Sequence, residues 1–140
     1  MPTEDDIAVR TAVDQWFAVL NAMLNGDPEP FAALYSHKED VTYMGAEGTY
    51  RIGWEATYAD WQAQAEQSTG GEVEGADIHV VVNGDLATAA HTTNGTVRQP
   101  NGETVRTAVR ETSVFRKEDG QWRMIGHHAD VVPALAKAFA

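Results

Sequence analysis

The hydrophobic positions in the first half of the chain repeat with the three- and four-residue steps of a helix. The first helix begins after Thr3, which together with Asp6 three residues later resembles a capping box. The glycine and prolines of "NGDPEP" end this helix and begin a short one over 29–35. A third helix is predicted over 54–67, with Trp54, Tyr58, Trp61 and Ala65 on one face. The apolar stripe of the first helix consists of Val9, Val13, Trp16, Phe17, Leu20, Met23 and Leu24.

In the second half, polar and apolar residues alternate with the two-residue period of a strand. Asn83-Gly84, Asn101-Gly102 and "EDG" at 118–120 interrupt this pattern, and such residues are typical of hairpin turns. Helices followed by an antiparallel meander predict a single α+β domain over 1–140. The predicted strands are a short one over 41–44 and long ones over 73–82, 86–99, 103–117 and 121–132.

The turns decide which side chains share a face of the sheet. We assume two-residue loops at both Asn-Gly pairs and a slightly longer loop at 118–120. The face that the helices cover is then apolar at one end and polar at the other, where it carries His91, Thr93, Arg110, Thr112, His128 and Asp130. The outer face is partly apolar, which predicts a homodimer packed through it. That face carries Val81, Leu86, Val109, Glu111, Ser113, Phe115, Ile125 and His127.

Two stretches resemble a known family: "NGDPEPFAALYSHKEDVTYMGAEG" after the first helix and "DGQWRMIGHHAD" near the end. With the order of elements, they are similar to the SnoaL-like and ketosteroid-isomerase-like branch of the nuclear transport factor 2-like superfamily. The resemblance implies a cone-shaped fold, with N-terminal helices packed on a curved antiparallel sheet around a cavity. Trp16 lies nearest the tyrosine of the isomerases, and Met44 or Gly45 stands where their aspartate base would be. The resemblance therefore does not imply ketosteroid isomerisation by the family mechanism.

The strongest candidate for a catalytic group is His128 together with Asp130. Neighbouring residues of a strand point to opposite faces, so His127 and His128 cannot act as a pair, whereas His128 and Asp130 can. His128 is the predicted general acid or base, oriented by Asp130, and Arg110 would stabilise negative charge. The same side chains could instead form a structural polar network that closes the wide end of the cone.

The remaining polar and aromatic residues suggest a pocket for a small, largely apolar or aromatic molecule. The aromatic residues could equally be ordinary core, and His91, His128 and Asp130 could form a metal site. No glycine-rich phosphate loop is present, so we predict no cofactor, and we predict no metal because nothing else in the sequence indicates one. The predicted ligand-binding residues are His91, Thr93, Thr112, Trp16, Tyr43, Trp54, Tyr58, Trp61 and Met124.

The resemblance and the candidate site together imply proton-transfer chemistry without a cofactor. The reaction would be an isomerisation, cyclisation, dehydration or hydrolysis. The alternative is a non-catalytic, dimeric module of the same fold that binds a ligand or mediates association.

The amino-acid composition and charge exclude several kinds of bond, site and binding partner. The 140 residues include no cysteine, which excludes disulfides and thiolate metal sites. The net charge of -11 argues against nucleic acid and anionic membrane surfaces as partners. No segment approaches the ~20 apolar residues that span a bilayer, and the start, "MPTEDDIAVR", is acidic. We expect a cytoplasmic protein.

Overall fold

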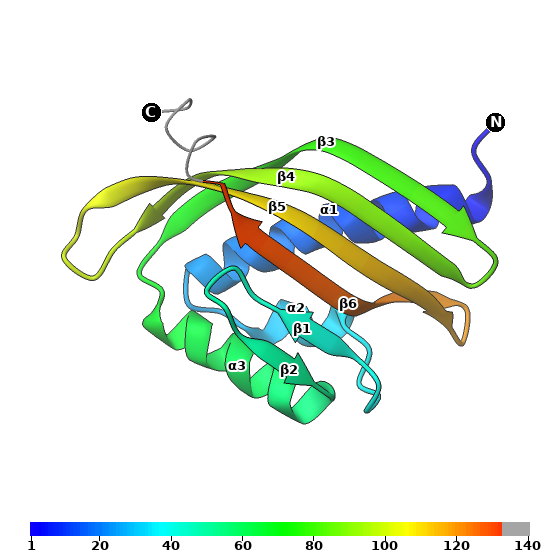
Figure 1. Cartoon of the computed structure of the whole chain (residues 1–140), viewed down its shortest axis with the longest axis horizontal. Helices are drawn as coiled ribbons and strands as arrows, with labels where there is room; N and C mark the ends of the chain where they lie inside the picture. Colours follow the sequence, from blue (N-terminus) through cyan, green and yellow to red (C-terminus); the bar gives the residue numbers. More distant parts are fainter. Residues whose placement is uncertain (133–140) are drawn as a thin grey trace.

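The computed structural model describes residues 1–132, in which helices lie on one side of a curved sheet (Figure 1). The helices are α1 (Glu4–Leu24), α2 (Glu29–Leu34) and α3 (Trp54–Gln67). The arrangement confirms the predicted α+β class. The strands are β1 (Thr42–Met44), β2 (Tyr50–Ile52), β3 (Gly71–Asn83), β4 (Leu86–Arg98), β5 (Thr104–Glu118) and β6 (Gln121–Val131).

The first helix begins and faces the core as its sequence predicts. The Thr3 hydroxyl accepts a hydrogen bond from the backbone N–H of Asp6 at 3.0 Å. The Asp6 carboxylate in turn accepts from the backbone N–H of Thr3 at 2.9 Å, which completes a capping box. No helix in the described part of the chain is both long and apolar enough to cross a membrane. The predicted stripe packs into the core through buried Val9, Val13, Trp16 and Met23 and part-buried Phe17, Leu20 and Leu24.

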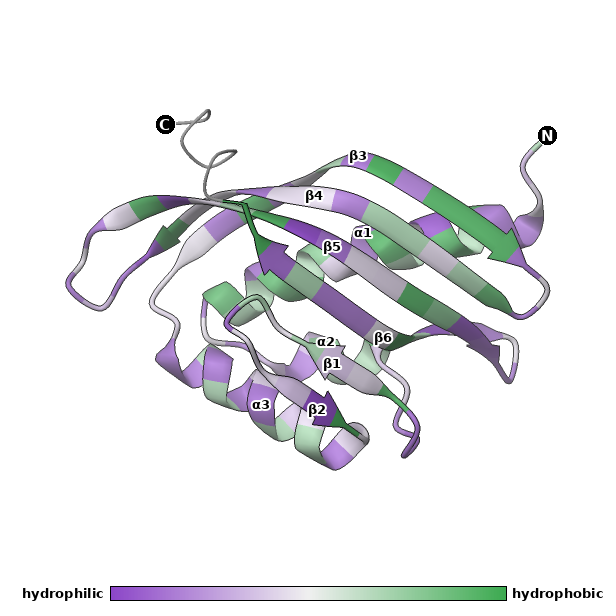
Figure 2. Cartoon of the chain, in the orientation of Figure 1, coloured by the Kyte–Doolittle hydropathy of each residue, from purple (hydrophilic) through white to green (hydrophobic). Residues whose placement is uncertain are grey.

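The strands form one sheet in the order β2-β1-β6-β5-β4-β3. Strands β3 to β6 pair antiparallel in sequence, which is the predicted meander. β1 pairs with β6 in parallel, and β2 extends the sheet beyond β1. β2 is too short to show a two-residue period, and the sequence did not predict it. Figure 2 shows that β4 is hydrophobic near its hairpin with β3 and more polar in its middle.

The hairpin between β4 and β5 differs from the predicted two-residue turn. Arg98 pairs with Thr104, which leaves a longer loop between them. The predicted turn would have paired Pro100 with Glu103, and a proline has no N–H to complete such a pair. Gln99 donates its N–H to the Glu103 carbonyl instead, at 2.7 Å. Because side chains alternate along a strand, this one-residue change brings the opposite face of β5 beneath the helices.

The turn between β5 and β6 is also different from the prediction. Glu118 pairs with Gln121, so the loop contains Asp119 and Gly120 alone. Both residues have positive φ, 50° and 81°, as a two-residue type I′ turn requires. The predicted longer loop was wrong because Asp119 adopts the left-handed conformation that lets the strands close immediately.

A β-bulge at Ile125 then inserts one extra residue into β6. An inserted residue reverses the alternation of side chains beyond it. Past the bulge Ser113 pairs with His127, and both side chains are buried on the helix side of the sheet. The next residue, His128, is exposed on the outer side. The bulge therefore decides which of the two adjacent histidines reaches the interior.

An aromatic cluster joins the three helices. The ring of Phe31 in α2 stacks on Trp61 of α3 with 4.3 Å between ring centroids, and Trp16 of α1 lies 5.4 Å from Trp61. Trp54 stacks on Tyr58 at 4.8 Å. The predicted face of α3 is thus confirmed, because its aromatic residues and Ala65 all contact the core.

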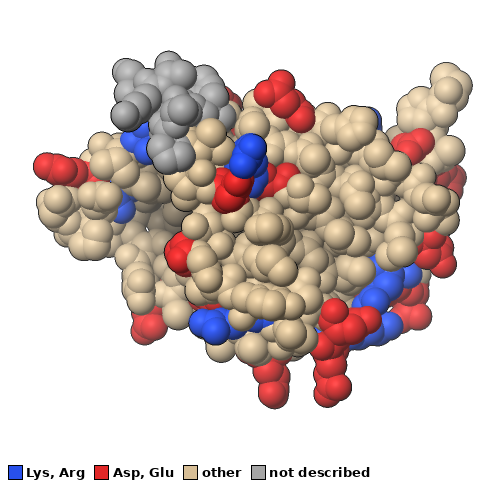
Figure 3. Space-filling view, in the orientation of Figure 1, with Lys and Arg blue, Asp and Glu red and all other residues tan. Residues whose placement is uncertain are grey.

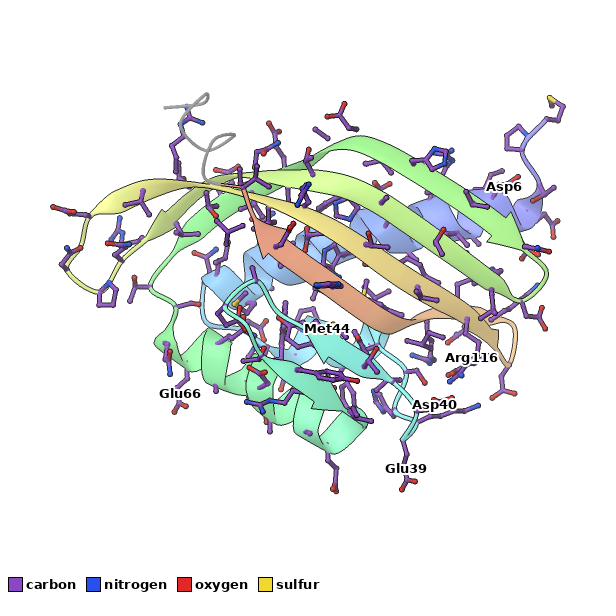
Figure 4. The ribbon with its side chains drawn as sticks, in the orientation of Figure 1. Asp6, Glu39, Asp40, Met44, Glu66 and Arg116 are labelled. Atoms are coloured by element: carbon purple, nitrogen blue, oxygen red, sulfur yellow. The ribbon has the colours of Figure 1, made fainter. Side chains whose placement is uncertain are left out.

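Ionic contacts fix the loop that precedes β1. Arg116 of β5 donates to both carboxylate oxygens of Asp40, at 2.7 and 3.0 Å, and Figure 4 shows the two side chains pointing toward each other. Arg116 also donates to Glu118 at 2.8 and 2.9 Å, and Glu118 accepts from the Ser36 hydroxyl at 2.8 Å. The loop is thereby attached to the end of β5, and the strand that follows it brings Tyr43 to the interior.

We expect that Gly95 of β4 cannot be replaced without loss of stability. A Cβ there would lie 2.1 Å from the Glu72 carbonyl oxygen and 2.7 Å from the Val73 Cα. Because these are backbone atoms, Gly95→Ala should lower the free energy of unfolding by about 1–3 kcal/mol. Gly126→Ala is the control, since the nearest atom to its Cβ is the Thr42 hydroxyl at 3.3 Å. Chemical denaturation measures both variants, and equal stabilities would contradict this close approach.

Candidate functional site

A cavity of about 220 Å³ lies between the helices and the inner face of the sheet. Its apolar walls come from both the helices and the strands, whereas its hydrogen-bonding groups come largely from the strands. It is smaller than the ~300–1,000 Å³ of typical drug-sized ligand sites, so it suits a small molecule. The lining includes Trp16, Leu20 and Met23 of α1, Trp61 and Gln64 of α3, Tyr43 of β1, and Thr93, Glu111 and His127 of the long strands.

Glu111 contributes a carboxylate to the polar wall of this cavity, although the residue is only 4 % exposed. The Nε2 atom of His127 lies 2.9 Å from its Oε2 atom. The Thr93 hydroxyl donates to Oε1, and the Nδ1 atom of His91 lies 3.7 Å from Oε1. These partners belong to β4 and β6, the two strands beside β5, so the buried charge is compensated from both sides.

His127 is held between two polar partners and two aromatic rings. Its Nδ1 atom lies 2.9 Å from the Ser113 hydroxyl, opposite the Nε2 contact with Glu111. The carboxylate can only accept, so Nε2 carries the proton and Nδ1 accepts from Ser113 when the imidazole is neutral. The ring centroid lies 4.4 Å from that of Trp16 and 5.8 Å from that of Tyr43. Both the tautomer and the orientation of the ring are therefore fixed.

The surroundings keep the Glu111 carboxylate ionised at neutral pH. Burial alone would raise the pKa of Glu111, but hydrogen bonds from His127 and Thr93 and the nearby imidazoles lower it below its ordinary range. Burial lowers the pKa of His91, and this outweighs the attraction of Glu111 for its charged form. Glu111 is thus ionised and His91 neutral near pH 7.

Five of the predicted ligand-binding residues lie at or beside the cavity. Trp16, Tyr43, Trp61 and Thr93 line it, and His91 is buried next to it. Their placement agrees with the sequence analysis, while their role in binding stays a prediction.

The other four predicted ligand-binding residues lie elsewhere. Met124 is fully buried in the core and does not line the cavity. Trp54 and Tyr58 are half-buried in the aromatic cluster, at a distance from the polar wall. Thr112 is exposed on the outer face, so its predicted place beneath the helices was wrong.

The predicted catalytic group is on the outer face as well. His128 is exposed, and Arg110 and Asp130 form an ion pair whose side chains are 68 % and 48 % exposed. Arg110 donates from Nε at 3.0 Å and from Nη2 at 2.5 Å. The predicted place of these residues beneath the helices was wrong because the longer β4–β5 hairpin turns the other face of β5, and of β6 with it, toward the helices. A metal site with His91 is wrong for the same reason, since His91 and His128 lie on opposite faces.

The sequence analysis did place Glu111, Ser113 and His127 on a common face, but it assigned that face to a dimer interface. In the structure they are interior residues. Pro100 was the signal that would have corrected the assignment, because it rules out the assumed two-residue turn. The sequence showed neither the two-residue turn at Asp119-Gly120 nor the bulge at Ile125, but these two one-residue shifts together leave His127 on the predicted face with Glu111 and Ser113.

The known proteins most useful for comparison share this fold. The model of the SnoaL-like domain family matches residues 9–134. A proposed dehydratase of the nuclear transport factor 2-like family from Streptomyces avermitilis is 23% identical with a TM-score of 0.81, covering 94% of this chain and 99% of that one. A ketosteroid isomerase-like protein from Erwinia carotovora atroseptica is 19% identical with a TM-score of 0.77, covering 93% and 98%.

A third similar structure is a proposed calcium/calmodulin-dependent protein kinase II association domain from Xanthomonas campestris. It is 24% identical with a TM-score of 0.73, covering 89% of this chain and 86% of that one. At these identities the likeness shows the fold alone. No curated protein sequence matches the chain.

The family match covers most of the chain, and helices followed by a curved, mostly antiparallel sheet are the nuclear transport factor 2-like fold. The chain therefore belongs to the SnoaL-like domain family.

Proposed function

We propose that this protein binds a small, largely apolar molecule in the cavity and catalyses a proton transfer on it. One observation carries the proposal: an ionised carboxylate, Glu111, lines an aromatic-walled cavity while remaining almost completely buried. A base of this kind has little water to compete with its substrate. The names of the dehydratase-like and isomerase-like neighbours are consistent with such chemistry.

Glu111 is the proposed general base. It would remove a proton from a carbon next to a carbonyl group and leave an enolate on the ligand. Return of the proton to a different carbon gives isomerisation, and departure of a neighbouring hydroxyl gives dehydration. A carboxylate without a raised pKa suffices for this step when the enolate is stabilised as it forms.

Donors for the enolate oxygen would come from the aromatic wall. The indole nitrogens of Trp16 and Trp61 have no acceptor within the described residues, although both side chains line the cavity. The Tyr43 hydroxyl accepts from Gln64 at 3.0 Å and keeps its own proton, because burial raises its pKa. A ligand carbonyl would satisfy one or more of these donors.

His127 is proposed as a positioning residue for Glu111. Its Nε2–H points at the carboxylate and would hold it in place, and because Nε2 is already protonated the substrate proton would stay on Glu111. Ser113 acts through His127 as a positioning residue, because its hydroxyl holds Nδ1 as an acceptor.

We also propose a homodimer formed through the outer face of the sheet. The middle of the face seen in Figure 3 is largely uncharged, with charged side chains mostly around its margins. Val81 and Leu86 are about half exposed there, at 50% and 51%. The centre of a subunit contact is typically depleted of charged residues. The association-domain neighbour fits a second candidate function, in which the same dimer binds a ligand or a partner without catalysis.

The proton-transfer proposal is tested by deuterium exchange into cyclohexanone and phenylacetone, followed by NMR in D₂O. The protein should accelerate exchange of the α-protons, and Glu111→Gln should reduce the rate at least 100-fold, the lower bound for loss of a general base. His127→Gln should reduce it about tenfold. The control is His79→Gln on β3, because His79 is exposed and outside the cavity. Loss of exchange in His128→Gln with full activity in His127→Gln would overturn the assignment.

Acid is expected to destabilise the fold through the same network. Folding lowers the pKa of His91 below 6.5 and that of Glu111 below 4.5, so both groups bind protons more readily in the unfolded chain. The free energy of unfolding should therefore decrease as the pH falls below about 6.5, and decrease further below about 4.5. His91→Gln should remove the first decrease and keep the second. Urea denaturation across this range measures both, and a wild-type stability constant from neutral pH to pH 5 would contradict the expectation.

The dimer is tested by sedimentation of the wild type and of Thr112→Glu. Thr112 is exposed near the middle of the outer face, where it pairs with His128 and with Ala90. A charge there would be buried against its symmetry mate, so the variant should be monomeric and folded at micromolar concentration. Ala63→Glu on the exposed side of α3 is the control and should stay dimeric. A monomeric wild type would contradict the proposal.

A further inference from the structure

The charged side chains that line the cavity are all acidic. Glu111 lies on the sheet, and Glu47 comes from the loop between β1 and β2. Among the described residues no lysine or arginine contributes to the lining. The two carboxylates approach from different elements, so the negative potential does not depend on one loop.

The nearest strand arginines point away from this space. Val97 and Thr107 line the cavity, whereas their neighbours Arg98 and Arg106 alternate to the other side of the sheet and are exposed. Arg51 of β2 forms an ion pair with Asp60, with 3.1 Å between Nε and Oδ2. Basic side chains are thus available to this part of the fold, but none is directed into the cavity.

Glu47 is held in place by its own loop. Its carboxylate folds back over Gly45, where an added Cβ would lie 2.3 Å from Oε1. The Thr49 hydroxyl donates to the same oxygen at 3.1 Å. Beside this loop, burial and the charges of Glu47, Asp60 and Glu111 raise the pKa of the Tyr43 hydroxyl. The potential around Tyr43 is therefore negative.

Aromatic rings complete the surroundings that a cation requires. Trp16, Trp61 and Tyr43 all line the cavity. The faces of such rings carry partial negative charge and attract ammonium groups, more strongly when water is excluded. An apolar body would fill the space beside Leu20 and Met23, which the same cavity wall provides.

We infer that the cavity recognises a positively charged, amine-bearing small molecule with an apolar body, in preference to neutral or anionic molecules of the same shape. This inference rests on the proposed function, because the same cavity holds the ligand, and it names the substrate class. The ammonium group would lie between the Glu47 rim and the aromatic rings, with the reacting carbon toward Glu111.

The test compares three probes of one shape: benzylamine, which is protonated at neutral pH, benzyl alcohol and benzoate. A cavity of about 150 Å³ holds benzene, so these probes fit a space of about 220 Å³. Calorimetry or ligand-observed NMR measures their affinities. Benzylamine should bind at least tenfold more tightly than either of the others, which corresponds to about 1.4 kcal/mol.

Substitutions of the two cavity carboxylates then test whether the cavity causes the preference for benzylamine. Glu47→Gln and Glu111→Gln should each weaken benzylamine binding at least fivefold and leave benzyl alcohol within twofold. Glu66→Gln makes the same change in net charge at an exposed position on α3, where Figure 4 shows the side chain pointing away from the fold. It should change neither affinity by more than twofold. Thermal denaturation of each variant confirms that the fold is intact, and Glu47→Gln carries the test if Glu111→Gln does not fold.

The outcomes separate this inference from the proposed function. Equal binding of benzylamine and benzyl alcohol, tighter binding of benzoate, or absence of benzylamine binding would each overturn the preference for cations. Ketone exchange that still depends on Glu111 would then leave the proton-transfer proposal standing. An equal loss of benzylamine binding in Glu66→Gln would also overturn the inference, because the effect would come from net charge.

Discussion

Burying a carboxylate that contacts no lysine or arginine of residues 1–132 is the constraint on which the interior of this protein depends. An isolated carboxylate in such a place would take up a proton. Glu111 keeps its charge because Thr93 and His127 hydrogen-bond to it from the strands on either side. The charge can persist only while both neighbouring strands keep their alignment with β5. Fold and site are therefore linked, since a slip of one residue at either hairpin would remove a donor from the carboxylate.

The elements were predictable because their signals are local. The stripe on α1, the aromatic face of α3 and the positions of the three hairpins all follow from spacing within short segments. The choice of face was not local. Both faces of β5 carry apolar side chains, such as Phe115 on one and Val114 on the other, so burial alone does not select between them. The loop around Pro100 made the selection, and the proline could be recognised in the sequence.

The two faces of the sheet show how exposure to solvent changes the strength of a contact between charged or polar side chains. Arg110 and Asp130 form a close bidentate pair, but in solvent such a pair contributes little to stability. Glu111 and His127 make a contact of similar length away from water, where the field between them is much stronger. The fold is shared with proteins named as enzymes and as association domains. Chemistry in this fold therefore depends on which polar residues a given member turns inward.

The bulge in β6 has a consequence for how such domains diversify. Two adjacent histidines occupy the strand, and the extra residue at Ile125 selects the one that faces the helices. If β6 paired regularly with β5 past Met124, without a bulged residue, each later residue would move one position along β5, and His128, with Asp130, would face the inside. A lineage could thus exchange one complete set of interior polar groups for another without altering any of them, provided that the core absorbed the shift.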